Sequence, residues 1–229
     1  MRDAVLLPDR LVVTTDNSGA IGEKLADMVQ VADELTAYFS ARVTLLEQWA
    51  ANAQPFTVIL HNFSGENSWA AYQQGVEKVL KEASIEDIIL TGSTETNMDL
   101  LQSAVAVTML GKEQSPLVST AGDWYTYGKP LVGNEVLETT EEVASLAKIR
   151  QALDEEIVHQ IWPVGSKGIL AELKRLFNKS TVQVKSTLDL TKSSGPSTVV
   201  LLKIPFEQQR KAEELFGSSL RKLVVEISD

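Results

Sequence analysis

The stretch that most constrains this chain is residues 11–24, where an apolar, β-branched run stops abruptly at polar residues and glycines. The run predicts a buried strand over residues 11–15. We expect this strand to deliver a carboxylate, an amide and a hydroxyl group to a loop, from Asp16, Asn17 and Ser18.

Two glycines and a lysine follow these polar residues. Gly19 and Gly22 allow the backbone to adopt a positive φ or to approach a ligand closely. With Lys24, the stretch combines a carboxylate suited to a metal ion with a lysine and N–H groups suited to phosphate. An ordinary turn after a strand is the alternative. The stretch matches neither the Walker pattern nor Gly-x-Gly-x-x-Gly.

The composition describes a globular protein. The chain has 229 residues, of which 44% are hydrophobic and 23% charged, enough for one large or two small domains. It contains no cysteine, which excludes disulfides and thiolate metal sites and is consistent with the cytoplasm. No apolar run approaches the length of about 20 residues that crosses a membrane, and we expect no signal peptide.

The net charge of −10 is unevenly distributed. Residues 163–229 carry 11 basic and 7 acidic side chains, or +4, which leaves −14 for residues 1–162. So acidic a portion repels nucleic acid, and a phosphate ligand bound there would need a divalent cation. A solvated acidic surface is the alternative interpretation.

Two more predicted strands end in polar groups. The strand over residues 56–60 leads to His61 and Asn62, and the strand over residues 88–91 leads to a second polar series. Polar groups at the ends of adjacent strands converge on one edge of a sheet, so these side chains are candidates for one site. His61 is either a catalyst or a hydrogen-bonded loop residue. The second series consists of Gly92, Ser93, Thr94, Glu95, Thr96 and Asn97.

Glu95 has two interpretations. It is a candidate metal ligand or base, or it caps a helix that starts near residue 98. After it, the alternation over residues 102–110 predicts a strand with one apolar side, formed by Val105, Val107 and Met109.

Two helices are predicted between these strands. The first covers residues 34–52 with Asp33 as its N-cap. Arg42 and Glu47 lie on or beside its apolar face, and one interpretation is a charge pair on the helix flank. Its expected buried face comprises Leu35, Tyr38, Phe39, Val43, Leu46 and Trp49. The second helix begins after Ser64 or Asn67 and buries Trp69, Tyr72, Val76, Val79 and Leu80.

The rest of the chain predicts a smaller α/β region. Residues 111–133 have weak periodicity and indicate a domain connection, and a helix is expected over residues 139–154. The end of the chain then follows the order β-α-β-β-α-β, which implies an antiparallel sheet with helices on one face. Its elements are expected over residues 157–163, 169–177, 181–186, 198–204, 207–216 and 223–227. Residues 165–168, which open a helix, form either an anion site or a plain tight turn.

Taken together, the polar motifs at residues 16–24, 61–63 and 91–97 resemble the ATP-binding superfamily of aminoimidazole ribonucleotide (AIR) synthase. Residues 128–136 resemble the junction between the two domains of that family. Within the superfamily the chain is most similar to the α-ribazole kinase group, which serves salvage of the lower ligand of cobalamin. The resemblance extends to about residue 177.

This resemblance implies a two-domain α+β fold with mixed and antiparallel sheets and helices on one face. Residues 1–111 would form an ATP-binding and dimerisation domain, and residues 112–229 a shortened C-terminal domain. It also implies an ATP- and Mg²⁺-dependent kinase that phosphorylates the ribose 5′-hydroxyl of α-ribazole, a nucleoside, as a cytoplasmic homodimer. No nucleic acid or membrane is expected as a partner.

The resemblance also assigns roles to residues. Asp16 and Glu95 would bind Mg²⁺ or organise the phosphates, and with His61 they form the candidate catalytic set. The triphosphate would lie along Asn17, Ser18, Gly19 and Lys24. Facing the substrate or the phosphates would be His61, Asn62, Thr94 and Asn97, within a loop that includes Gly92 and Ser93.

The chain departs from the family pattern in three respects. The second domain is short, Ser93 replaces the second glycine of the usual Gly-Gly pair, and the usual acidic, glycine-rich loop of the second domain is reduced to residues 165–168. The alternatives to a kinase are therefore a nucleotide-binding relative without kinase activity and a subunit that acts with a partner chain.

Overall fold

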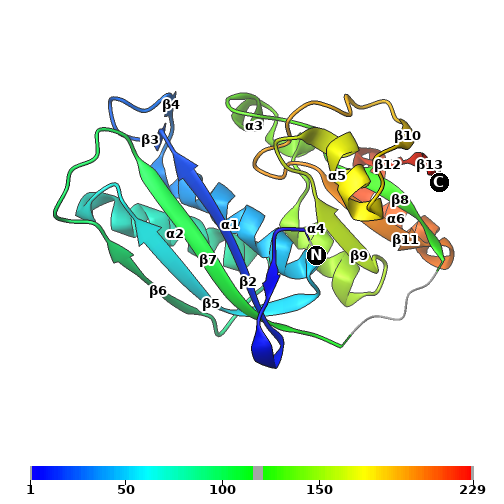
Figure 1. Cartoon of the computed structure of the whole chain (residues 1–229), viewed down its shortest axis with the longest axis horizontal. Coiled ribbons are helices and arrows are strands. Elements are labelled where there is room, and N and C mark those ends of the chain that lie inside the picture. Colours follow the sequence, from blue (N-terminus) through cyan, green and yellow to red (C-terminus); the bar gives the residue numbers. More distant parts are fainter. Residues whose placement is uncertain (1, 116–120, 228–229) are drawn as a thin grey trace. The chain divides into compact units, whose positions relative to one another are not determined.

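The computed structural model describes residues 2–115 and 121–227 and has two compact units (Figure 1). The first comprises Asp3–Ser115, and the second comprises Pro116–Asp229 together with Arg2. Each unit contains its own sheet and helices, so the predicted α+β class with mixed and antiparallel sheets is confirmed. The division falls a few residues after position 111, because the last strand of the first unit continues to Glu113.

The first unit is built on a five-stranded sheet. Its spatial order is β1 (Val5–Leu6), β2 (Leu11–Gly19), β7 (Ala104–Glu113), β5 (Ala53–Asn62) and β6 (Ile89–Thr94). β5 and β6 are parallel, and the other neighbours are antiparallel. Because β2 and β5 both oppose β7, the strands β2, β5 and β6 run in the same direction and end at the same edge of the sheet.

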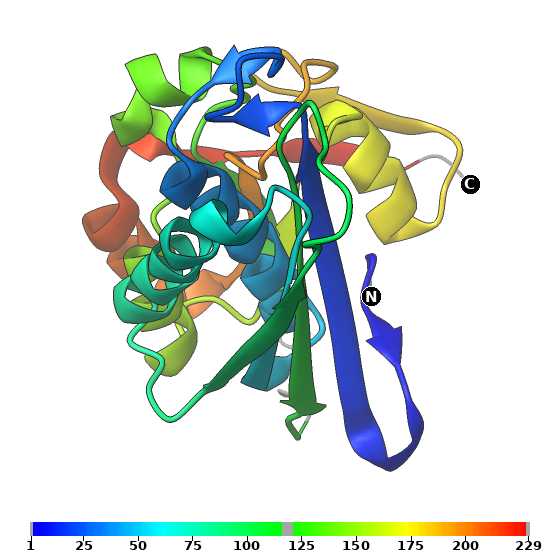
Figure 2. The same cartoon turned by 90° about the vertical axis from the view of Figure 1, so that its left-hand side faces the viewer.

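Two helices cover one face of this sheet, α1 (Asp33–Ala50) and α2 (Trp69–Glu82), as Figure 2 shows. Alternate residues of each strand point toward them, as the pleat requires. Val12, Val107 and Leu60 are fully buried on this side. Two short strands, β3 (Ile21–Gly22) and β4 (Val29–Gln30), pair in parallel beyond the end of β2.

The helix α1 is buried on more sides than its apolar spacing predicts. Leu46 and Trp49 are buried as expected, while Leu35, Tyr38, Phe39 and Val43 are only partly buried. The side toward the sheet instead carries small and polar residues that bond to strand backbone. Thr44 Oγ1 donates to the Val107 carbonyl at 3.5 Å, and Gln48 Nε2 donates to the Val12 and Met109 carbonyls at 3.2 and 3.0 Å.

Arg42 and Glu47 do not lie on a solvent-exposed flank of α1, which corrects that interpretation. They are 1% and 2% exposed, so both lie inside the unit. The helix also begins at Asp33 itself, with Ala32 in the N-cap position.

The second unit contains a four-stranded antiparallel sheet. Its order is β12 (Leu220–Lys222), β8 (Gly122–Tyr127), β11 (Val200–Pro205) and β9 (Gln160–Pro163). Two expectations are wrong here. The first is that residues 111–133 form only a domain connection, because β8 lies within this range and is a central strand of the sheet. Residues 116–120 of the range lie outside the described residues. Second, the strands expected at 181–186 and 223–227 do not join the four-stranded sheet, because β10 (Val182–Lys185) and β13 (Val224–Ile227) pair with each other.

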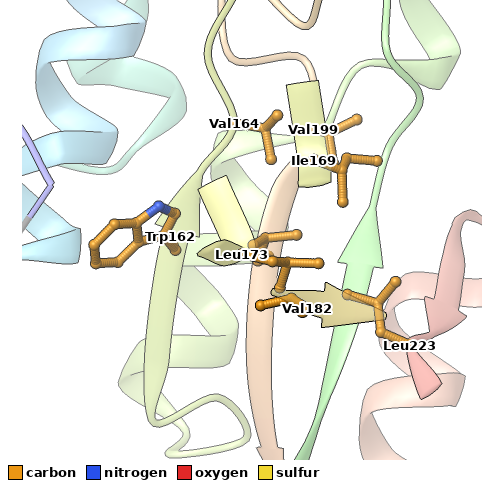
Figure 3. Close-up of a cluster of buried hydrophobic side chains, with 8 residues drawn as sticks. Trp162, Val164, Ile169, Leu173, Val182, Val199 and Leu223 are labelled. Atoms are coloured by element: carbon orange, nitrogen blue, oxygen red, sulfur yellow. The ribbon is translucent and has the colours of Figure 1, made fainter. Parts of the chain in front are cut away.

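The helices of this unit are α3 (Glu135–Glu138), α4 (Leu146–Asp154), α5 (Gly168–Phe177) and α6 (Gln209–Phe216). The helix expected over residues 139–154 starts later than predicted, because Val143 is extended and Ser145 caps α4 by accepting the Lys148 N–H. Figure 3 shows the core between α5 and the strands, formed by Trp162, Val164, Ile169, Leu173, Val182, Val199, Leu201 and Leu223.

Short 3-10 turns complete the fold at Pro8–Arg10, Glu66–Ser68, Thr140–Glu142, Phe206–Gln208 and Gly217–Ser219. Within the described ranges, no helix combines the length and the apolar character that crossing a membrane requires.

Candidate functional site

The candidate residues of the first unit lie at one edge of its sheet. The strand register places Ser18 of β2, Val105 of β7, Asn62 of β5 and Thr94 of β6 in one row. Asp16 begins the neighbouring row, which ends at Gly92. The sequence motifs therefore meet at the edge where β2, β5 and β6 end.

Residues 16–19, 61–62 and 92–94 are on strands and not in loops, which corrects the predicted strand ends, whereas Lys24, Glu95 and Asn97 lie outside strands. β2 continues through Gly19, β5 through Asn62 and β6 through Thr94. Because side chains alternate along a strand, the candidates divide between the two faces of the sheet. On the face covered by helices are Asp16, Ser18, Asn62, Gly92 and Thr94. The open face carries Asn17, Gly19, His61 and Ser93.

Asn62 is used entirely within the protein. Its side chain is 1% exposed, and its Oδ1 accepts the Ser64 N–H at 2.9 Å. Its Nδ2 donates to the Gly65 carbonyl at 2.7 Å and to Thr94 Oγ1 at 3.2 Å. Asn62 therefore shapes the turn after β5 and fixes the hydroxyl of Thr94.

Glu95 closes the turn after β6. Its Oε1 accepts the backbone N–H groups of Asn97 at 2.6 Å and Met98 at 3.2 Å. These hydrogen bonds, first from Asn97 and then from Met98, lower the pKa of Glu95. No helix follows at residue 98, so the carboxylate caps a turn and not the expected helix.

The carboxylates of Asp16 and Glu95 are not held at one position. Their strands are separated by two others in the sheet, roughly 14 Å at the usual spacing of about 4.8 Å per strand. Mg²⁺ binds oxygen ligands at about 2.0–2.1 Å, so one ion cannot take both groups in this conformation. In the part of the chain that the structure describes, no three His, Asp or Glu side chains gather closely enough to hold a metal ion.

A single carboxylate still suits Mg²⁺, which commonly binds one or two carboxylates together with substrate phosphates. Asp16 is partly exposed at the edge where the strands end, and Glu95 Oε1 accepts two backbone N–H groups.

His61 lies on the open face of the sheet, away from Asp16. Its Nε2 is 3.3 Å from Thr108 Oγ1, and Thr108 in turn donates to Thr15 Oγ1 at 3.2 Å. These three residues form a polar line across β5, β7 and β2. Asp16 and His61 therefore lie on opposite faces of the sheet near the same edge.

Lys24 and the glycines behave differently from one another. Lys24 Nζ donates to the Leu100 carbonyl at 2.7 Å, which ties two loops together. Gly22 needs to be glycine, because its φ is 154° and a Cβ would lie 2.4 Å from Ser103 Oγ. Gly92 leaves room for the Trp69 ring, 2.9 Å from a Cβ placed there. A Cβ at Gly19 would meet open space.

Three buried polar residues that the sequence analysis did not assign to the site organise this edge. Asp27 accepts the N–H groups of Lys24 at 2.9 Å and Ser103 at 2.7 Å. Asp33 accepts the Glu23 N–H at 3.2 Å, and Tyr72 contacts Ser64 Oγ at 2.7 Å. Burial raises the pKa of Tyr72 to about 12. The one sequence signal for this role is that Asp27 and Asp33 lie close together in the short segment between β2 and α1.

Comparisons with known proteins identify the fold of the chain. A scan against protein-family models gave no match, and neither did a comparison with curated protein sequences. Solved structures do match. Thiamine monophosphate kinase from Aquifex aeolicus has a TM-score of 0.68 and 11% identity, over 100% of this chain and 88% of that chain.

Two further solved structures also match the chain. The HypE–HypF complex matches with a TM-score of 0.64 and 14% identity, over 99% of this chain and 92% of the other. T. maritima PurL complexed with ATP matches with a TM-score of 0.59 and 13% identity, over 99% of this chain and 42% of that one. At these identities the likeness concerns the fold, and the chain has the AIR-synthase-like fold.

Proposed function

We propose that the chain is an ATP-dependent kinase that phosphorylates a small-molecule alcohol. The observation that carries this proposal is the meeting of Asp16, Ser18, Asn62 and Thr94 at one sheet edge in a fold shared with ATP-dependent proteins. Solved structures with this fold include AaThiL complexed with AMPPCP and TMP and PurL complexed with ATP.

The nucleotide phosphates are proposed to lie at the end of β2, beside Asn17, Ser18, Gly19 and Lys24. Asp16 would hold Mg²⁺ together with the phosphates, and the ion would neutralise charge that develops on the transferred group. Glu95 is assigned the shaping of the loop that contains Asn97, and Asn62 the positioning of Thr94, because the hydrogen bonds of both side chains stay within the protein.

The proposed acceptor is the ribose 5′-hydroxyl of α-ribazole. Its oxygen forms a bond to the γ-phosphorus, the bond from that phosphorus to the ADP oxygen breaks, and the hydroxyl proton is released. We further propose that the chain acts in the cytoplasm as a homodimer through the open face of its first sheet. His61 on that face would then lie at or near the dimer interface and contact substrate there.

The test is an ADP-release assay with ATP, Mg²⁺ and α-ribazole, with the product identified by mass. The proposal predicts a product one phosphoryl group heavier and a loss of turnover of at least about 100-fold in Asp16→Asn, as expected for a charge acting in the transition state. Asp87→Asn, at an exposed turn before β6, is the matched control and should retain activity. ADP release without phosphorylated product, or full activity in Asp16→Asn, contradicts the proposal.

A nucleotide-binding protein without kinase activity, alone or beside a partner chain, is the second candidate. The separation of Asp16 from Glu95 and the engagement of Glu95 with backbone N–H groups favour it. It predicts saturable ATP binding without phosphorylated product for every acceptor tested.

A further inference from the structure

Two loops at one end of the first unit expose large apolar side chains. One joins β3 to β4 and the other joins β6 to β7, and both lie at the same end in Figures 1 and 2. The exposed fractions are 102% for Leu25, 81% for Met28, 72% for Met98, 44% for Leu100 and 84% for Leu101. We call these five residues the end patch. Large apolar side chains exposed together in this way are typical of interaction sites on soluble proteins.

The backbone beneath the end patch is held in place by hydrogen bonds between the two loops. Lys24 Nζ donates to the Leu100 carbonyl, and Gln102 Nε2 donates to the Ala26 carbonyl, both at 2.7 Å. The Asp27 carboxylate, which is 8% exposed, accepts the Ser103 N–H at 2.7 Å. The apolar side chains are therefore presented on an ordered support, which lowers the entropy cost of binding.

The charges around the end patch select a cationic partner. Glu23, Glu66 and Asp99 are exposed on the three loops at this end, and Glu95 is partly exposed. Lys24 is the one basic residue in the described loops at this end, and its Nζ bonds to a carbonyl of the patch. The whole unit Asp3–Ser115 contains 6 basic and 16 acidic residues, a net charge of −10. Such a field attracts positive charge and repels acidic surfaces.

The apolar chemistry points to a helix as the binding element. Leucine and methionine side chains are aliphatic, and the flexible methionine side chain adjusts its shape to varied partners. Amphipathic helices bind such surfaces through residues spaced three and four apart, while basic residues on their flanks meet acidic rims. We propose that the end patch docks a cationic amphipathic helix of a partner protein.

The test measures binding of a labelled 18-residue peptide of leucine and lysine, arranged as an amphipathic helix, to the full chain by fluorescence anisotropy. A peptide of the same composition in scrambled order is the control for charge alone. We expect 1:1 binding of the amphipathic peptide, at least about 10-fold tighter than the scrambled one, since only the amphipathic order gathers the leucine side chains on one face for burial. Raising the salt concentration should weaken it.

Two variants locate the binding surface. The double variant Leu25→Ser with Leu101→Ser should weaken binding at least about 10-fold, because both side chains are exposed and their removal leaves the fold intact. Ile89→Ser is the matched control, since Ile89 is 62% exposed on β6 away from the end patch, and it should leave binding unchanged.

Three outcomes would overturn the proposal. They are equal binding of the scrambled peptide, unchanged binding by the double variant, and a self-association of the chain that the double variant abolishes while neither peptide binds. The last result would assign the end patch to a second copy of the chain. None of these outcomes depends on kinase activity.

Discussion

At the scale of single residues, the hydrogen bonds of a side chain decide whether it is available to a ligand. Asn62 and Glu95 were both chosen from the sequence because they are polar and follow strands. In the structure Asn62 satisfies two backbone groups and the Thr94 hydroxyl, and Glu95 closes its own turn. Sequence identifies such residues as important but cannot separate a ligand contact from a local structural role, because both use the same groups.

Replacement of Asn62 tests this assignment. Asn62→Ala removes three hydrogen bonds and leaves buried groups unpaired, so we expect a loss of about 2–3 kcal/mol in the free energy of unfolding. Urea denaturation measures it, with Asn67→Ala as control because Asn67 is exposed in the following turn. Unchanged stability combined with lost ATP binding would instead make Asn62 a ligand contact.

The stability at high pH tests the burial of Tyr72. Its pKa is raised to about 12 from 10.0 by burial, so the folded state favours the neutral phenol. This contribution is complete below pH 10 and is lost as the pH rises toward 12. Between pH 10 and pH 12 we expect the free energy of unfolding to fall by about 1–2 kcal/mol less in Tyr72→Phe than in the parent protein. Urea denaturation at each pH measures this difference. Tyr38, whose pKa is also raised to about 12, contributes to the loss that remains, as does Tyr125, whose pKa is raised by burial.

Identical pH dependence in the two proteins would contradict this account of Tyr72.

At the scale of elements, apolar spacing predicted most strands and helices, and the errors have identifiable causes. The strands β2, β5 and β6 continue into their polar ends because sheet pairing depends on backbone groups and tolerates polar side chains at an exposed edge. The strand β8 was missed because its neighbours on both sides were needed to recognise it. The buried face of α1 differs from its apolar spacing because threonine and glutamine face the sheet there and donate hydrogen bonds to strand carbonyls.

The contact between α1 and α2 depends on a glycine. A Cβ on Gly75 would lie 2.1 Å from the Glu34 carbonyl oxygen and 2.8 Å from the Tyr38 nitrogen. Replacing glycine by alanine inside a helix ordinarily stabilises it by about 1 kcal/mol. Here we expect Gly75→Ala to destabilise the protein by about 1–3 kcal/mol, because the two backbones must separate.

Thermal denaturation checks the sign of this change. Gln74→Ala, on the exposed side of the same helix, is the control and should be nearly neutral. A stabilised Gly75→Ala protein would mean that α1 and α2 are not packed as closely as described.

At the scale of the whole molecule, the chain divides into two units and shares its fold with solved structures such as thiamine monophosphate kinase from Aquifex aeolicus and T. maritima PurL. The sequence motifs indicated the correct fold because all three lie at the ends of strands that reach the same edge of one sheet. That shared position fixes the spacing of the motifs along the chain. The acceptor is not determined at this scale, since the fold is shared by proteins as different as a thiamine monophosphate kinase and HypE. The acceptor depends on side chains that face it, and these are the residues least fixed by fold.

The most direct measurement is a calorimetric titration of the full chain with AMPPCP in the presence of Mg²⁺. The account predicts saturable binding with one nucleotide per chain, weakened at least about 10-fold by Asp16→Asn and unchanged by Asp87→Asn, since loss of a charged ligand to a bound ion costs more than about 1.4 kcal/mol. Absence of binding, or equal affinity in Asp16→Asn, would contradict a nucleotide site at this edge of the first sheet.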